Sequence, residues 1–274
     1  ELFSEIDPSG VSKSQILGGG PLALNADPNV WKSFSFTTTL GPDVSGGVTL
    51  QLTATTGGDG GSLAQLFYDN VKITLTDVGP TARVQVIHNS ADAAASVVDV
   101  YLDGVLALND FAFRTASPFI DVPAGTEISV AVAPSNSTSV ADAIATFPYT
   151  LADGETYVLV AEGIVSPSGY TPATAFGIAV YAMGQEAAVT RGNTDVLVHH
   201  GSTDAPTVDV NEVSGPLLLV DDISYGEFAA NGYLELPTAD YTINISTADG
   251  STVVESYDAP LATLGLDDAA IVVV

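Results

Sequence analysis

The chain has 274 residues, of which 46% are apolar and 14% charged, and 33 acidic against 6 basic residues give a net charge of −27. This composition excludes a disordered tail, because it supplies ample material for packed cores. The negative charge excludes a nucleic-acid partner, whose phosphates it would repel, and disfavours anionic membranes. It suits Ca²⁺, high ionic strength or both, with plain solubility of a secreted protein as the simpler alternative.

The chain contains no cysteine, which by itself assigns the protein to no compartment. It begins at Glu1 without an apolar signal core, as expected of a mature chain after processing. The longest apolar runs, such as Leu217–Val220 and Ile271–Val274, are too short to span a bilayer. We therefore expect a secreted protein, extracellular or on the cell surface, with no membrane span.

The first 79 residues predict a small β domain of their own. Alternating runs of β-forming residues predict strands over Trp31–Leu40, Val48–Thr55 and Leu66–Thr76. Gly79-Pro80 is typical of a domain boundary.

A motif in the middle of the chain returns near its end. Residues 86–93 (VIHNSADA) lead into 98–104 (VDVYLDG), and 112 residues later 198–206 (VHHGSTDAP) lead into 208–210 (VDV). Downstream, residues 119–124 (FIDVPA) correspond to 233–238 (YLELPT). The last two-thirds of the chain is therefore interpreted as one module written twice.

Short β-forming runs between Gly, Pro and Asp turns predict strands throughout both copies. In the first copy they lie near 83–88, 97–102, 118–122, 126–133, 155–161 and 175–183, with room for a short helical turn near 141–145. In the second copy they lie near 195–200, 207–211, 216–221, 232–236, 240–247, 251–257 and 269–274. No window sustains helical periodicity over three turns, so we expect an all-β protein of tandem Ig-like or jelly-roll β-sandwiches.

The predicted domains are a partial jelly-roll-like domain over 1–79 and sandwiches over 80–190 and 193–274. The second sandwich lacks a counterpart of the strand over 175–183, and an open sheet edge is a template for pairing. Two explanations stay open: the chain is a fragment of a longer protein, or a neighbouring subunit supplies the strand. Under the second, Ile271, Val272, Val273 and Val274 form an assembly strand at the junction.

The repeat resembles the family of secreted bacterial and archaeal domains of unknown function numbered 4397. The residues that carry this resemblance are Arg83–Asp92 with Val98–Gly104, and Asp195–Asp204 with Val208–Val210. The resemblance implies an Ig-like sandwich on a surface or extracellular protein, and no known activity.

The N-terminal part resembles the tail of a carbohydrate-binding jelly roll, through residues 31–36 (WKSFSF) and 67–71 (FYDNV). In such folds the Asp of the Asp-Asn-Val strand can lie beside a structural Ca²⁺, so the resemblance makes Asp69 a candidate ligand. Trp31 is a candidate platform for a sugar ring, with packing in the sandwich core as the alternative.

No reaction chemistry is expected. His88, Ser90 and Asp92 have the residue types of a hydrolase triad, but they lie on one short stretch, and a triad draws its members from separate elements. The simpler interpretation is that they bond backbone groups of the loop after the strand.

In the second copy, the polar residues could bind a metal ion, but the stronger interpretation is that they are solvated turn residues. His200, Asp204 and Asp209 could hold a metal ion, whereas His199 and His200 face opposite sides of a strand and cannot easily share one. Carboxylates could also build Ca²⁺ sites, with solvated turn residues as the alternative; these are Asp99, Asp103, Asp209, Asp221 and Asp222. Asn136 and Asn244 begin N-glycosylation sequons.

These observations favour a non-enzymatic extracellular structural protein, a subunit of a surface fibre, sheath or adhesive stalk. Copies of the chain would assemble head to tail, and β-strand complementation is one way in which they could join. The first alternative is a polysaccharide-binding module of a secreted surface protein. The second is a surface hydrolase whose catalytic domain lies outside this sequence.

Overall fold

The computed structural model describes Leu2–Ser4, Gln15–Gly18, Val48–Leu50, Val71 and residues 79–274 except Pro167 and Pro216. The chain forms two compact units, residues 1–75 and 76–274. In the first, strands β1 (Leu2–Ser4), β2 (Gln15–Gly18) and β3 (Val48–Leu50) form an antiparallel sheet in the order β2-β1-β3. Strand β3 lies within the predicted strand Val48–Thr55. The predicted strands over Trp31–Leu40 and, apart from Val71, Leu66–Thr76 lie outside the described residues.

The second unit begins with two sheets made of residues 81–182, which we call the first half. One sheet has the order β10-β9-β5-β6, and the other has the order β12-β11-β4-β7 with β8 also paired to β4. Their bounds are β4 (Thr81–His88), β5 (Val97–Leu102), β6 (Val105–Ala112), β7 (Thr115–Ala116), β8 (Ile120–Pro123), β9 (Glu127–Pro134), β10 (Ala145–Thr150), β11 (Thr156–Glu162) and β12 (Gly177–Ala182). Two 3₁₀ turns, η1 (Ala93–Ala95) and η2 (Val140–Asp142), lie in its loops.

Residues 193–273, the second half, form two further sheets, ordered β16-β13-β19 and β15-β14-β17-β18. Their bounds are β13 (Asn193–Val198), β14 (Val208–Glu212), β15 (Leu217–Ile223), β16 (Leu234–Pro237), β17 (Asp240–Thr247), β18 (Val253–Pro260) and β19 (Ala270–Val273). The described chain is therefore all-β, as predicted. Both halves lie in one compact unit, and the domain boundaries expected from the sequence stay a prediction.

The two halves pair their strands in the same way. Strand β4 pairs parallel with β11 and antiparallel with β8, and β13 pairs parallel with β19 and antiparallel with β16. In the other sheets, β5 lies between β6 and β9 as β14 lies between β15 and β17. This matching plan supports the duplication inferred from the sequence.

Three strands of the first half were not predicted: β6, the two-residue β7 and β10. Strand β6 follows β5 through a two-residue turn in which Asp103 and Gly104 have φ of 48° and 81°, the left-handed backbone of a tight hairpin. Strand β10 contains Pro148, which argues against a strand in a sequence pattern. Because β10 is the edge strand of its sheet, the missing proline N–H does no damage there.

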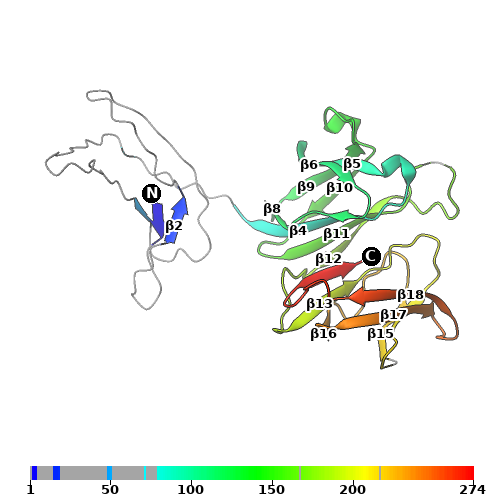
Figure 1. Ribbon diagram of the computed structural model, residues 1–274. Helices are drawn as coiled ribbons and strands as arrows, with labels where there is room; N and C mark the ends of the chain where they lie inside the picture. The colour runs from blue at the N-terminus through cyan, green and yellow to red at the C-terminus, as the bar shows by residue number, and fades with distance from the viewer. Residues whose placement is uncertain are drawn as a thin grey trace, which may run out of the picture. The chain divides into compact units, whose positions relative to one another are not determined.

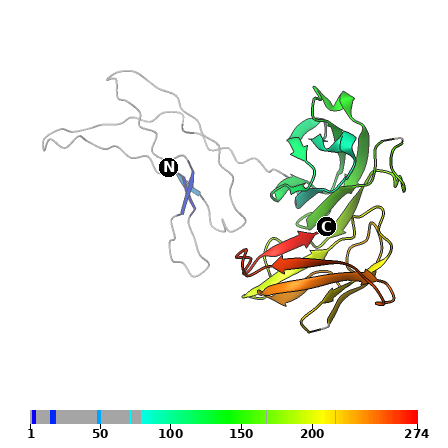
Figure 2. The same cartoon turned by 45° about the vertical axis from the view of Figure 1, so that its right-hand side comes forward.

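The four sheets of the second unit stack as layers. Side chains of β11 alternate: Tyr157 and Leu159 pack into the core of the first half, and Val158 and Val160 pack on the opposite face. That opposite face meets Leu197 of β13 and Val272 of β19, so the two middle sheets lie against each other. Figures 1 and 2 show the halves one above the other, with β19, in red, at their boundary.

Positions that correspond in the two copies meet at this boundary. Phe119 and Tyr233, and likewise Val158 and Val272, occupy the same apolar cluster. The Asn89 side chain donates to the Gly201 carbonyl over 3.1 Å, and these residues hold the same place in the repeated motif, 112 positions apart. A contact between equivalent positions, and a cluster to which equivalent positions of both copies contribute, are typical of a two-fold interface, here formed within one chain.

Leu197 is fully buried in this layer, so we expect Leu197→Ala to lower the free energy of unfolding by about 3 kcal/mol through lost burial and the resulting cavity. Chemical denaturation followed by circular dichroism measures the loss, with the exposed Leu264→Ala as the matched control. Hydrogen exchange should show reduced protection in both halves. A loss under about 1 kcal/mol, or a first half that keeps its protection, would contradict the shared layer.

Candidate functional site

The repeated motif of the first half holds a loop in place. The His88 ring bonds the Ala95 carbonyl through Nε2 over 2.7 Å, and the Ser90 amide bonds its Nδ1 over 3.3 Å. The Ser90 hydroxyl donates to the Gly163 carbonyl over 2.6 Å. Both ring nitrogens and the hydroxyl are therefore engaged with the backbone, as the simpler interpretation of this motif predicted.

Asp92 holds the start of the connection from β11 to β12. It is 1% exposed and accepts the amides of Ala94, Val165 and Ser166, together with the Ser166 and Tyr170 hydroxyls. Burial acts to raise the pKa of this carboxyl, but these hydrogen bonds outweigh it and hold the pKa at about 2. A depressed pKa contributes stability above the ordinary carboxyl pKa, and that stability is lost as the pH falls through about 2.

The second copy of the motif lacks this connection. His200 repeats the role of His88, bonding the Pro206 carbonyl over 2.9 Å and the Ser202 amide over 3.4 Å. The Ser202 hydroxyl, however, donates to Asp204 over 2.9 Å, and both residues are exposed. We call Ser202 and Asp204 the second clamp, and no segment of the described chain covers it as residues 163–170 cover Ser90 and Asp92.

The sheet beside the second clamp is one strand short. In the first half β11 lies between β4 and β12, whereas among the described residues β19 pairs with β13 alone and ends its sheet. The backbone amide of Asp195 donates to the Ala269 carbonyl and that of His199 to the Val273 carbonyl, both over 2.9 Å. Because backbone groups alternate in direction along a strand, those of Ala270, Val272 and Val274 point to the open edge.

The facing sheet is uncovered at the same place. In the first half, Phe147 of β10 lies 6.0 Å from Phe176, ring centre to ring centre, and the Tyr149 hydroxyl lies 3.5 Å from the Ile178 carbonyl of β12. In the second half, Tyr257 occupies the corresponding inward position of β18 and is 59% exposed. Strand β18 is exposed over most of its length. The open edge of β19 and the inner face of β18 together form what we call the acceptor site.

The expected assembly strand thus lies within this site. Ile271, Val272 and Val273 belong to β19, and Val274 follows it. Val272 packs between the halves, whereas Val273 and Val274 are exposed. The role of these residues in assembly stays a prediction.

The metal candidates gather only in part: Asp209 lies with Asp221 and Asp222, and His200 and Asp204 do not join them. Among the described residues, the carboxylates close enough to share an ion are Asp209, Asp221 and Asp222, whose ligand atoms lie within 4.8 Å of one another. His200 and Asp204 belong to no such group, and both ring nitrogens of His200 are engaged. Asp209 accepts the Asp222 amide over 2.9 Å, as Asp99 accepts that of Asp110 in the first half, so this carboxylate has a structural role in both halves.

Trp31 and Asp69, the candidates for carbohydrate and Ca²⁺, lie outside the described residues. Of the two sequons, Asn136 is exposed in the turn after β9. Asn244 lies within β17, half-buried, and its side-chain oxygen accepts the Ser256 hydroxyl over 2.6 Å. Asn136 is therefore the better placed acceptor for a glycan.

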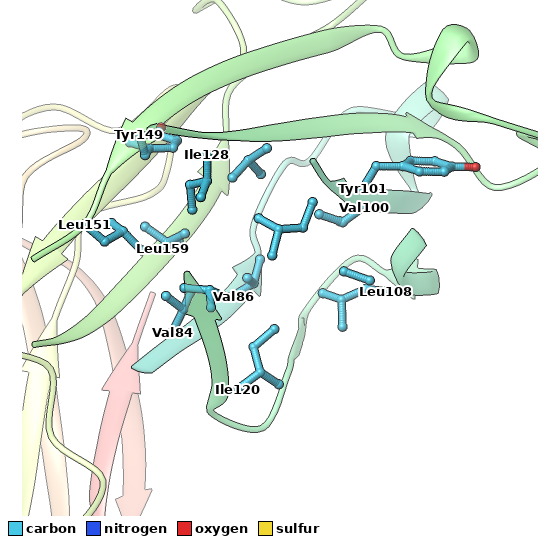
Figure 3. A pocket seen from close by; sticks show the side chains of 14 residues that line it. Val84, Val86, Val100, Tyr101, Leu108, Ile120, Ile128, Tyr149, Leu151 and Leu159 are labelled. Atoms are coloured by element: carbon cyan, nitrogen blue, oxygen red, sulfur yellow. The ribbon is translucent and has the colours of Figure 1, made fainter. Parts of the chain in front are cut away.

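The core of the first half contains a small apolar cavity of about 30 Å³. Val84, Val86 and Leu159 from one sheet point toward Val100 and Ile128 from the other (Figure 3). Ligand pockets are about ten times larger and carry a few polar groups. This cavity is a packing defect of the sandwich and not a binding site for a metabolite.

A buried polar pair joins the halves, which sequence reasoning missed. His199 Nε2 lies 2.8 Å from Glu162 Oε2, and Phe228 packs against the imidazole with ring centres 4.3 Å apart. Burial and the Glu162 carboxylate raise the pKa of the nearby Tyr225 hydroxyl to about 12, so it stays protonated. No sequence signal links positions 162 and 199, because the pairing depends on how the two sandwiches stack.

Two comparisons with known proteins gave matches. Residues 82–211 match the model of a family described as domain of unknown function (DUF4397), from β4 to β14. The resemblance expected of the first copy is confirmed, and the match stops before most of the second. A solved structure titled "Alpha-glucan recognition by family 41 carbohydrate-binding modules from streptococcal virulence factors" is similar at 10% identity and a TM-score of 0.21, over 69% of this chain and 92% of that one. At this TM-score the likeness supports no inference about a ligand.

A comparison with curated proteins found no match. No helix among the described residues is long and apolar enough to cross a membrane.

The unequal surroundings of the two motifs predict unequal mutational costs. Asp92→Ala should lower the free energy of unfolding by about 3 kcal/mol, because it leaves several buried donors unpaired. Asp204→Ala, its exposed counterpart, should change it by less than about 0.5 kcal/mol. Chemical denaturation near neutral pH measures both. Equal losses would show that the two carboxylates have the same role.

The Glu162–His199 pair should couple the halves energetically. Glu162→Ala should cost about 3 kcal/mol, because it leaves a buried imidazole without its partner. The double variant Glu162→Leu, His199→Phe should cost clearly less than the sum of its single variants. Glu186→Ala, which removes an exposed partner of Arg83, is the surface control and should cost under about 1 kcal/mol. Additive effects across the cycle would contradict the coupling.

Proposed function

We propose that the protein is a non-enzymatic extracellular structural protein, a subunit of a surface fibre, sheath or adhesive stalk. Its copies join head to tail by β-strand complementation at the acceptor site. The observation that carries this proposal is the unpaired edge of β19, at the place where β12 covers β11 in the first half. The negative charge and the β-sandwich architecture agree with a structural role.

Strand addition at this edge has a favourable energy balance. Each backbone hydrogen bond contributes about 1 kcal/mol net, and burial of apolar surface adds about 25 cal/mol per Å². Residues 270–274 (AIVVV) carry no charge, so the edge has none of the lysines or prolines that normally protect an open strand. Such an uncharged, apolar edge is more stable when another strand pairs with it than when it is exposed to water.

The net charge of −27 sets the conditions for assembly. Copies of so acidic a chain repel each other in dilute buffer, and the repulsion is screened within about 10 Å at 0.1 M salt. Assembly should therefore require salt or a divalent cation such as Ca²⁺. Negative-stain microscopy with and without a chelator separates the two requirements.

We expect Val273→Lys to abolish assembly, because Val273 is 48% exposed at the open strand and a lysine there disfavours edge pairing. Sedimentation velocity and negative-stain microscopy of the full chain in high salt measure the change. Val105→Lys is the matched control, since Val105 is 70% exposed on the edge strand β6, and this variant should assemble like the wild type. A wild-type chain that stays monomeric at every salt and Ca²⁺ concentration, or equal assembly of Val273→Lys, would refute the proposal.

The alternative function, polysaccharide binding by the N-terminal region, rests on the sequence cues around Trp31 alone. A pull-down on insoluble polysaccharide, with Trp31→Ala as the control, distinguishes it from assembly. Retention of the wild type and loss of the variant would favour this alternative.

A further inference from the structure

The second half keeps the groups that hold a β11–β12 type of connection, although no described segment uses them. We infer that an extended, uncharged polypeptide segment, not among the described residues, completes this half, held by Ser202 and Asp204, the edge of β19 and the inner face of β18. This inference rests on the proposed function and specifies the chemistry of the donor. Its basis is a comparison of the two halves at corresponding positions.

The second clamp provides the first part of the argument. In the first half, Ser90 and Asp92 are 0% and 1% exposed because residues 163–170 lie over them. Ser202 and Asp204 have the same residue types at the same motif positions, but they are exposed and bond each other. Asp92 accepts hydrogen bonds from several backbone amides. Asp204 can accept as many once a segment places its backbone N–H groups beside it.

The acceptor site provides the second part. Its edge presents the backbone groups of Val272 and Val274, and its floor presents Tyr257 where the first half has Phe147 packed on Phe176. Val274 lies beside Gly201, so the end of β19 is next to the clamp. The second clamp, the open edge of β19 and Tyr257 therefore adjoin one another. A single segment could pass the clamp first and then pair with the edge above Tyr257, as residues 163–182 do in the first half.

The segment that fills the equivalent place in the first half defines what fits. Residues 163–183 (GIVSPSGYTPATAFGIAVYAM) contain no Asp, Glu, Lys or Arg. The segment starts with Gly163, which has a φ of 83° and lies so close to the Ala175 backbone that a Cβ would collide with it. Its strand directs Ile178 into the sandwich and Ala179 and Tyr181 to the other side. The donor should share a small leading residue, a hydroxyl-bearing loop and a strand that is apolar on both faces.

Charge selects the donor in the same way. Residues 193–274 contain 14 acidic residues and no Lys or Arg, so an acidic strand would be repelled from the site. An uncharged segment meets no such penalty. Within the described chain, the segment of this chemistry is residues 163–182, which is already paired with β11.

A synthetic peptide with the sequence of residues 163–183 and two added C-terminal lysines tests this inference. It is titrated into the full chain, kept below the concentration of self-assembly, by calorimetry. We expect saturable binding of one peptide per chain, protection of the Val272 and Val274 amides from hydrogen exchange, and no binding of a scrambled peptide with the same tag. Asp204→Ala and Tyr257→Ala should each weaken binding at least tenfold, because they remove the acceptor of the loop amides and the apolar floor.

Asp258→Ala, an exposed acidic change on the same strand as Tyr257, is the control and should bind like the wild type. Asp204 and Tyr257 are exposed without the peptide, so their variants should stay folded, which circular dichroism checks. A peptide that binds no better than the scrambled one, or binds Asp204→Ala and Tyr257→Ala like the wild type, would overturn the inference. If the chain binds the peptide but never assembles, the inference holds and the proposed function is refuted. If the chain assembles but does not bind the peptide, the proposed function holds and the inference is refuted.

Discussion

The packing of two β-sheets against each other between the halves is the constraint on which the rest of the second unit depends. Each middle sheet is covered on both faces, so its central strand must be apolar on both sides. Strand β11 is buried along almost all of its length, and Leu197 of β13 is fully enclosed. This double coverage fixes the halves relative to each other and leaves only the outer sheets and the edges facing water.

Double coverage also makes polar groups in the middle layer costly unless they are paired. Glu162 and His199 meet this requirement in part, because Glu162 Oε2 and His199 Nε2 bond each other across the boundary whereas His199 Nδ1 is buried without a hydrogen-bond partner. Thr194 meets it by bonding the Leu266 carbonyl. The His-x-Ser-x-Asp motif follows the same rule at the end of β4, where its polar atoms are buried and bonded to backbone. The chemistry of the motif is therefore explained by hydrogen-bond satisfaction, and its exposed second copy is the exception that points outside the described chain.

Much of this could be predicted from the sequence, since strand periodicity and turn residues are local. The strands of the second half and the shortage of one strand follow from alternation and from the repeat. Strand β10 was not predicted because it contains Pro148, which a strand tolerates only at the edge of a sheet, and a sequence does not say which strands are edges. The stacking of the halves was not predicted because it depends on residues that are far apart in the sequence, such as Val158 and Leu197. The continuous apolar run over 157–161 did carry a signal, since a strand covered on one face alternates and one covered on both does not.

The comparison of the halves separates what a β-sandwich needs from what it can leave open. The second half folds with three strands in its inner sheet because that sheet is covered by the first half on one side and by β14 and β17 on the other. What it leaves unsatisfied is local: the free edge of β19, the exposed Tyr257 and the second clamp. All three are satisfied in the first half by one continuous segment, residues 163–182. A single added segment therefore accounts for all three deviations, whereas independent explanations would need one cause for each.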